Sequence, residues 1–357
     1  MHLRLPASAA ALAATVALLQ AQESPSVRFR SGVELINVTA TVSDADGRFV
    51  PNLTQDDFLV YEDDRRVDVT HFSAERVPVS LGIALDTSGS MAGDKMNAAR
   101  AAIGRFVNEL LNRNDELFLY RFSNYPVLVQ GWTRDRRDLL DPLDRLTPNG
   151  ATAMYDAVAK AIPLAQQGQN RKRALVVISD GNDTSSRTDI RDLKETIRQS
   201  EVLVYAVGID GEGEQVVRRA PVSPPPRVRI PLPLPFPGTP RGGGGRFPPS
   251  TPQPPIGGGN GGSGGTGGST WQGRGLDDRV NVSALRDMTD DSGGRTEIIR
   301  SPRDLDPATA GIADELSKQY YLGYQSPGTR DGRWHAIRVE VKTRGYRVRA
   351  RKGYFAS

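Results

Sequence analysis

Between residues 77 and 210 the sequence alternates between two hydrophobic patterns, and this alternation limits the fold more than any other feature. Short, nearly continuous apolar runs such as VPVSLGIALD, RALVVISDG and EVLVYAVGID are typical of strands covered on both faces. Between them, KMNAARAAIGRFVNELL, ATAMYDAVAKAIPLAQQ and DIRDLKETIRQS carry apolar residues at helical spacing. ELFLYRFS and PVLVQGW read as a pair of strands. The pattern predicts an α/β fold with a doubly wound, mostly parallel sheet.

Both ends of the chain have a different, strand-rich pattern. Residues 33–72 contain alternating apolar runs separated by the turn-forming Asp-Ala-Asp-Gly, and residues 320–355 return to strands after the last helix. Neither segment has enough strands to be stable alone. We therefore expect the two ends to pair with each other and form a small β-sandwich beside the α/β domain.

A segment rich in proline and glycine interrupts the α/β pattern. Residues 211–275 hold 14 of the 25 prolines, together with runs such as GGGNGGSGGTGGST. Such a composition cannot bury enough apolar surface to offset the entropy of ordering, so we expect a disordered surface insertion. A proline-rich ligand for a partner's aromatic groove is the less favoured alternative. After it, residues 280–294 predict a helix ending at Gly293-Gly294, and residues 303–319 predict the last helix.

The N-terminus has the features of an export signal. His2 and Arg4 precede an alanine-rich apolar run over residues 7–21, and a polar segment ending at Pro25 breaks it. The run is shorter than the roughly 20 apolar residues of a membrane-spanning helix, although an uncleaved anchor is an open alternative. No other segment is apolar enough to span a bilayer. We expect an exported protein, located in the periplasm, on the cell surface or in the medium.

These patterns predict the following organisation. Residues 1–22 are a signal peptide, and residues 30–76 form one half of the sandwich. The α/β domain covers residues 77–319 and contains the insertion at 211–275. Residues 320–357 form the other half of the sandwich. The chain has no cysteine, which excludes disulfides, thiolate nucleophiles and cysteine-held metals. Its net charge of +4 is too small to indicate nucleic acid as a partner. The sequence leaves the oligomeric state open.

Polar side chains follow the predicted buried strands at their carboxyl ends, where open α/β sheets bind ligands. Asp86, Ser88 and Ser90 form a D-x-S-x-S pattern after the first strand. Thr152 begins a helix, and Asp180 ends a later strand. Two carboxylates and three hydroxyls without imidazole or thiolate suit a hard divalent ion, above all Mg²⁺ or Mn²⁺, with Ca²⁺ also considered.

The composition of this predicted metal site indicates how it would act. Ser88 and Ser90 are expected to ligate directly and Thr152 in one of two states, whereas Asp86 and Asp180 would act directly or through water. With two carboxylates only, the metal retains positive charge and an open position. An Asp or Glu carboxylate from a protein partner would complete the shell.

The same residues carry a resemblance to a known family. Asp86-Thr87-Ser88-Gly89-Ser90, Thr152 and Asp180, with LYRFSN, GATAMYDAV and VVISDGNDTSS around them, resemble the metal-ion-dependent adhesion site of von Willebrand factor type A domains, which are Rossmann-like. The resemblance covers residues 77–319 apart from the insertion. The two chain ends are similar to a bacterial subgroup of exported proteins described as VWFA-related. The family implies cell adhesion or protein binding, and a last helix, here residues 303–319, that shifts when ligand binds.

The same residues are compatible with roles other than metal-dependent protein binding. D-x-S-x-S alone is also a helix-capping pattern, and Asp94, Asp156 and Asp183 are interpreted as first-turn, capping or solvated acids. No histidine lies near Ser88 or Ser90 to act as a base, so we expect no enzymatic activity. A structural or assembly role in the cell envelope, with the metal only bracing loops, stays open.

The basic C-terminal strand gives a further alternative. Arg347, Arg349 and Arg351 are expected on one solvated strand face, with Tyr346 and Val348 packed on the other. The alternative is that this face contacts an acidic surface or polymer of the cell envelope.

Overall fold

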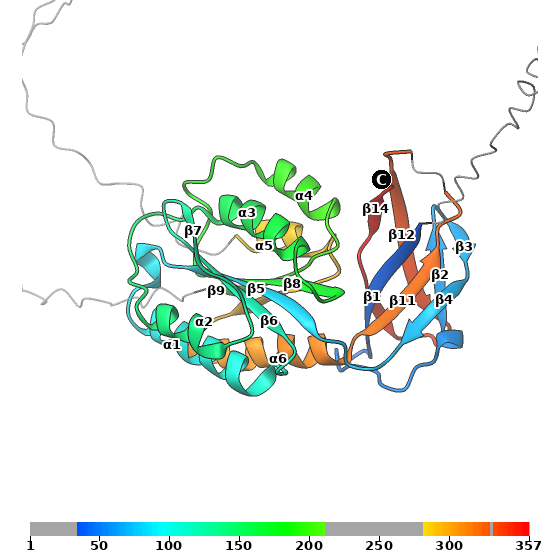
Figure 1. Ribbon diagram of the computed structural model, residues 1–357, viewed down its shortest axis with the longest axis horizontal. Helices are drawn as coiled ribbons and strands as arrows, with labels where there is room; N and C mark the ends of the chain where they lie inside the picture. The colour runs from blue at the N-terminus through cyan, green and yellow to red at the C-terminus, as the bar shows by residue number, and fades with distance from the viewer. Residues whose placement is uncertain (1–33, 211–280, 329–330, 357) are drawn as a thin grey trace, which may run out of the picture.

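The computed structural model describes residues 34–210, 281–328 and 331–356, which form an α/β domain and a β-sandwich side by side (Figure 1). The predicted signal peptide and the predicted insertion at residues 211–275 lie outside the described residues. None of the helices in the described ranges is long and apolar enough to cross a membrane.

The α/β domain is built on a six-stranded sheet in the order β10-β9-β8-β5-β6-β7. Its strands are β5 (Val79–Asp86), β6 (Glu116–Phe122), β7 (Pro126–Thr133), β8 (Lys172–Ser179), β9 (Leu203–Ile209) and β10 (Thr296–Ile299). All neighbouring strands pair in parallel except β7, which pairs antiparallel with β6 at the edge. The predicted mostly parallel sheet is confirmed.

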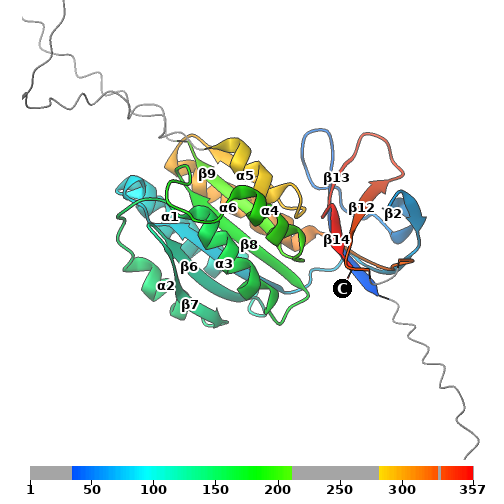
Figure 2. The same ribbon diagram turned by 90° about the horizontal axis from the view of Figure 1, so that it is seen from above.

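Helices cover both faces of this sheet (Figures 1 and 2). They are α1 (Asp94–Arg105), continued by a π-helical turn (Phe106–Leu110), α2 (Arg136–Asp144), α3 (Met154–Gln166), α4 (Ile190–Arg198), α5 (Val282–Thr289) and α6 (Leu305–Lys318). Short 3₁₀ turns lie at Gln55–Asp57, Gly89–Met91 and Pro302–Asp304. One apolar core joins α1, α2 and α6 to one face of the sheet, and a second core joins α3, α4 and α5 to the other.

The central strand β5 shows why these segments are strands. All eight of its residues are buried, and alternate side chains enter the two cores. Gly82 leaves room for the ring of Phe118 on β6, because a Cβ at Gly82 would lie 2.1 Å from Phe118 Cζ. A strand covered on both faces is nearly all apolar, which is the pattern seen in the sequence.

One helix ends earlier than predicted. The sequence predicts a helix ending at Gly293-Gly294, but α5 ends at Thr289. The segment after it packs directly on β9, where Ser292 Oγ accepts a hydrogen bond from Val204 N at 2.9 Å. A Cβ at Gly294 would lie 2.0 Å from the carbonyl oxygen of Val204, so this close contact, and not a helical turn, sets the local path.

The β-sandwich consists of two four-stranded sheets, in the orders β13-β1-β11-β4 and β14-β12-β2-β3. The strands are β1 (Leu35–Ser43), β2 (Phe58–Glu62), β3 (Arg65–Val67), β4 (Val69–Ser73), β11 (Tyr320–Gln325), β12 (Trp334–Val341), β13 (Arg347–Arg349) and β14 (Gly353–Phe355). Each sheet therefore contains strands from both chain ends, which confirms the predicted sandwich. Between the sheets lies one apolar core that includes Val38, Val60, Tyr320 and Ile337.

Charged side chains join the sandwich to the α/β domain. Glu315 on α6 accepts a hydrogen bond from the hydroxyl of Tyr205 at 2.9 Å and another from Thr41 of β1 at 3.1 Å. Its carboxylate also pairs with Arg295 at 3.1 Å and with Arg349 of β13 at 2.6 Å. The helix that the resemblance predicts to move is therefore held to the sandwich near its C-terminal end.

The basic strand at the C-terminus differs from the prediction. The strand stops at Arg349, and Arg351 is only 8% exposed and lies 3.3 Å from Glu201. Because Arg349 pairs with Glu315 and Arg351 with Glu201, the interpretation of a solvated face is wrong for both. These arginines link the sandwich to the α/β domain.

Candidate metal centre

The five residues singled out in the sequence lie at the carboxyl ends of β5 and β8 and on the loops beside them. Asp86 is the last residue of β5, and Ser88 and Ser90 follow in the turn that leads to α1. Asp180 directly follows β8, and Thr152 lies two residues before α3. Since β5 and β8 are neighbours in the sheet, their ends bring the two aspartates to the same edge.

Hydrogen bonds connect four of these five residues. Asp86 Oδ1 accepts from Ser88 N at 2.7 Å, and Asp86 Oδ2 accepts from Ser179 Oγ at 2.5 Å. Ser88 Oγ and Ser90 Oγ are 3.0 Å apart, and Ser90 Oγ donates to Asp180 Oδ1 at 2.8 Å. These bonds join Asp86, Ser88, Ser90 and Asp180 into one polar cluster, in which the Asp86 carboxylate is linked through the backbone N of Ser88.

Thr152 lies beside this cluster, across Gly181. A Cβ built on Gly181 would lie 3.7 Å from Thr152 Oγ1 and 4.0 Å from Ser90 Oγ, so both hydroxyls border the same small space. The backbone of Thr152 is held by Thr184, whose hydroxyl accepts from Thr152 N at 3.0 Å and whose N donates to Thr152 O at 2.8 Å. The loop after β8 therefore positions Thr152.

Asp156 and Asp183 brace the loops behind Thr152. Asp183 Oδ2 accepts from Tyr155 N at 2.8 Å, at the start of α3. Asp156 Oδ1 accepts from the N and the hydroxyl of Thr188, at 2.9 and 2.6 Å. Burial acts to raise the pKa of Asp156, but these hydrogen bonds, with those from Arg187 N, lower it overall. Asp94 lies in the first turn of α1, as predicted.

The electrostatics of the cluster are dominated by a fully buried carboxylate. Asp86 is 0% exposed, and burial raises its pKa to about 6 despite the hydrogen bonds from Ser179 and Ser88. The carboxylate of Asp180 raises it further. Two neighbouring buried carboxylates are costly unless a cation compensates them, and this need fits a hard divalent ion held by oxygen ligands.

Lys95 is a site residue that the sequence analysis missed. Its ammonium group pairs with Asp180 Oδ2, so the cluster already contains one positive charge. Lys95 is in the first turn of α1, where the helix dipole disfavours a cation. That unfavourable position was the signal that could have indicated an acidic partner.

An exposed aromatic side chain lies close to this edge. Asn124 Oδ1 accepts from Ala151 N at 2.7 Å, which ties the loop between β6 and β7 to the segment before Thr152. The next residue, Tyr125, is 61% exposed. A large exposed ring on a loop at this end of the sheet is suited to contact with another molecule.

Comparison with known proteins agrees with this geometry. Residues 81–182 match the model of the von Willebrand factor type A domain, and this range contains all five candidate ligands. The chain therefore contains a domain of the von Willebrand factor type A family. A domain of this type implies a protein-interaction module.

Individual relatives are distant. Inter alpha-trypsin inhibitor heavy chain 4 of Mus musculus is 24% identical over 193 residues, which is 43% of this chain and 20% of the relative. Its counterpart from Bos taurus is 22% identical over 140 residues, 36% of this chain and 15% of the relative. The match thus spans about a fifth or less of the length of these curated relatives.

Solved structures also match. A von Willebrand factor type A protein from Catenulispora acidiphila is 13% identical with a TM-score of 0.45, covering 91% of this chain and 74% of that one. The hypothetical protein BatB from Bacteroides thetaiotaomicron is 18% identical with a TM-score of 0.43, covering 67% of this chain and 98% of that one. Neither comparison carries an inference about function.

Proposed function

We propose that this chain is an exported module that binds a protein partner through a divalent cation, Mg²⁺ or Mn²⁺. The observation that supports it best is the polar cluster of Asp86, Ser88, Ser90 and Asp180 at one sheet edge. Thr152 borders the same space through Gly181. Export is supported by the N-terminal signal pattern of the sequence.

In the proposed mechanism the hydroxyls of Ser88 and Ser90 ligate the ion, Thr152 ligates in one of two states, and the aspartates act directly or through water. Lys95 would then give up its contact with Asp180 or move aside. The ion supplies an electrophilic position for a partner's Asp or Glu carboxylate. Tyr125 and the loop between β6 and β7 would contact the partner's surface beside that carboxylate.

Binding is favoured over catalysis. Within the described residues, His71 is on β4 and His335 on β12, both in the sandwich and away from the polar cluster. Neither can serve as a base for Ser88 or Ser90, so we propose no enzymatic activity for this site.

One observation favours the alternative of a structural role in the envelope. The Lys95 ammonium pairs with Asp180, and hydrogen bonds of Thr184 and Asp183 brace the loops around Thr152. In that case the site would stabilise the loops, and a partner would bind elsewhere.

Calorimetric titration with Mg²⁺ and with Mn²⁺ tests the proposal on the full chain and on the variant Asp86→Ala/Ser88→Ala. We expect saturable binding at one site, lost in the double variant. Asp94→Ala is the matched control, since it removes a nearby carboxylate outside the cluster. Ser90→Ala, which leaves the buried Asp86 in place, should also weaken binding. Absence of binding to the folded chain would contradict the proposal.

Partner capture separates the two roles. With the immobilised chain and an envelope extract, the adhesion role predicts capture that chelation and Asp86→Ala both abolish. Capture that survives both treatments, with a lower melting temperature for Asp86→Ala, would instead support the structural role.

A further inference from the structure

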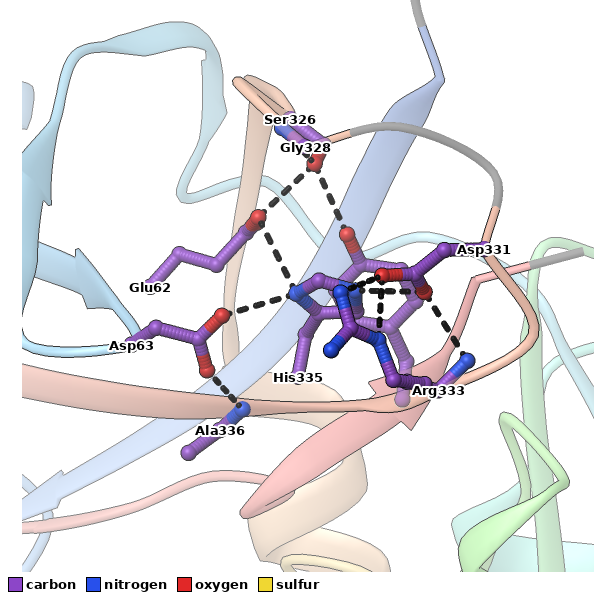
Figure 3. A network of polar contacts seen from close by, with 9 residues as sticks. Glu62, Asp63, Ser326, Gly328, Asp331, Arg333, His335 and Ala336 are labelled. Carbon is purple, nitrogen blue, oxygen red and sulfur yellow. Dashed lines mark hydrogen bonds and ion pairs between the residues drawn. The ribbon is translucent and has the colours of Figure 1, made fainter.

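A second cluster of ligand-type side chains lies in the sandwich, outside the α/β domain that holds the site above. Glu62 ends β2, Asp63 begins the turn after it, and both face His335 on the neighbouring strand β12 (Figure 3). One ligand atom from each residue can be chosen so that all three lie within 4.8 Å of one another. The cluster joins the N-terminal part of the sandwich to its C-terminal part.

The distances in this cluster suit a metal ion in place of a proton on His335 Nδ1. That nitrogen lies 2.8 Å from Asp63 Oδ2 and 3.9 Å from Glu62 Oε1. Zinc bonds of about 2.0–2.2 Å in a tetrahedral site place ligand atoms roughly 3.3–3.6 Å apart. Changes of about 0.3–0.8 Å in these two distances would bring them to the spacing of a coordination shell.

Glu62 supplies an independent indication. Its side chain is 2% exposed, and its Oε1 accepts from Ser326 Oγ at 2.8 Å. Its other oxygen, Oε2, and the buried hydroxyl of Tyr324 have no other hydrogen-bond partner among the described residues, and the side chains of Glu62 and Tyr324 interact with each other. A buried carboxylate beside other acids is costly unless a positive charge lies close to it, and a metal ion held together with His335 would supply that charge.

The remaining contacts hold the candidate ligands in position. Asp63 Oδ1 accepts from Ala336 N at 2.9 Å, which fixes the carboxylate against β12. On the far side of the ring, His335 Nε2 lies 3.2 Å from Asp331 Oδ1 (Figure 3). Asp331 is itself held by Arg333, whose N and Nε donate to it at 2.9 and 2.7 Å. A carboxylate that accepts the Nε2 proton leaves Nδ1 free to ligate, as metal-bound histidines require.

Space for an ion and one further ligand exists beside the ring. The cluster lines a pocket of about 300 Å³, open to solvent, that is also bordered by Gly328. A Cβ at Gly328 would lie 3.3 Å from His335 Cε1 and 3.5 Å from Glu62 Oε1. Gly328 therefore keeps this approach to the cluster clear.

We infer that Glu62, Asp63 and His335 form a binding site for a transition-metal ion of the Zn²⁺ class, with Asp331 orienting the imidazole and one position open to the pocket. The imidazole ligand separates this site from the oxygen-only cluster at β5 and β8, because imidazole favours zinc-class metals over magnesium. The inference is independent of the proposed function of the α/β domain. Its effect would be to cross-link the two chain ends within the sandwich.

Zinc titration by calorimetry on the full chain, in excess Mg²⁺, tests this site. We expect one equivalent of Zn²⁺ to be bound and that equivalent to be lost in His335→Gln. The matched control is His71→Gln, an exposed histidine on β4 of the same sandwich, which should retain it. Asp331→Asn should weaken binding by about 10–100-fold, as for other residues that orient a metal-bound histidine.

Further variants keep the test decisive if His335→Gln does not fold. Glu62→Gln preserves the size of the side chain and should also abolish binding of the one equivalent of Zn²⁺. Tyr324→Phe should still bind it. Co²⁺ bound to the unmodified chain should show the visible absorption of a tetrahedral site, and Zn²⁺ should abolish it. No zinc binding by the folded chain, or binding that persists in both Glu62→Gln and His335→Gln, would overturn the inference. The cluster would then be an ion-paired histidine alone.

Discussion

The free energy of unfolding of this protein should depend on pH through one buried lysine, Lys172, at the start of β8. Lys172 is 2% exposed, and its Nζ donates to the carbonyl oxygen of Leu316 on α6 at 2.8 Å. Burial lowers its pKa to about 8, and Arg76 lowers it further, while Asp115 and Glu315 oppose the shift. The lysine thus joins the sheet to the end of α6 at the cost of a desolvated charge.

The magnitude follows from the difference between the two pKa values. An unfolded lysine has a pKa of about 10.4, so between about pH 8 and pH 10 the unfolded chain holds a proton that the folded chain has lost. The unfolded state then binds more protons, and the free energy of unfolding rises with pH. At about 1.4 kcal/mol per pKa unit, the gain between about pH 7 and pH 10 is about 2–3 kcal/mol. Below about pH 8 both states are protonated and the penalty is present in full.

Urea unfolding at several pH values, compared with Lys172→Met, measures this contribution. Since the two proteins share all other titrating groups, the difference between their free energies of unfolding isolates Lys172. Between about pH 7 and pH 10, we expect the free energy of unfolding of the wild-type chain to rise by about 2–3 kcal/mol relative to that of the variant. Lys160→Met, at an exposed lysine on α3, should show no such gain. A difference that stays constant with pH would refute the reasoning.

Three further substitutions test the packing and the loops. Gly82→Ala should lower the free energy of unfolding by about 1–3 kcal/mol, because its Cβ would overlap Phe118, whereas urea melts of Gly131→Ala, with open space at that position, should change little. Glu315→Gln should lower the free energy of unfolding by about 1–3 kcal/mol, because it removes the charge that pairs with arginines of both domains. An unchanged melting temperature would contradict this. Asp156→Asn should lower the free energy of unfolding by about 1–2 kcal/mol, because it weakens the hydrogen bonds that hold the loop behind Thr152. Calorimetric titration should then show a weaker affinity for Mg²⁺.

Much of the fold was predictable because strands buried on both faces carry nearly continuous apolar runs. The runs in residues 77–86 and 173–181 showed this pattern and contain β5 and most of β8. Once they are parallel neighbours, polar residues directly after them must meet at one edge, which is why Asp86 and Asp180 could be placed together. The sandwich was predictable because neither chain end had enough strands alone.

Other features could not be predicted because they depend on how separate elements pack. The end of α5 at Thr289 is set by close contact with β9, and nothing in its own sequence shows this contact. Arg349 and Arg351 looked like a solvated face until the sandwich was placed against α6 and Glu201.

The sequence by itself determined the alternation of strands and helices, the two-ended sandwich and the set of candidate oxygen ligands, since each rests on local pattern or on neighbouring strands. Only the tertiary structure decided which charges meet across the molecule. Lys95 reaches Asp180, and Glu62 and Asp63 reach His335 across more than 270 residues of chain, because strand pairing and packing bring them together. Long-range pairing of charged side chains leaves no local pattern in the sequence, and for that reason the proposed zinc-class site could be inferred only from the structure.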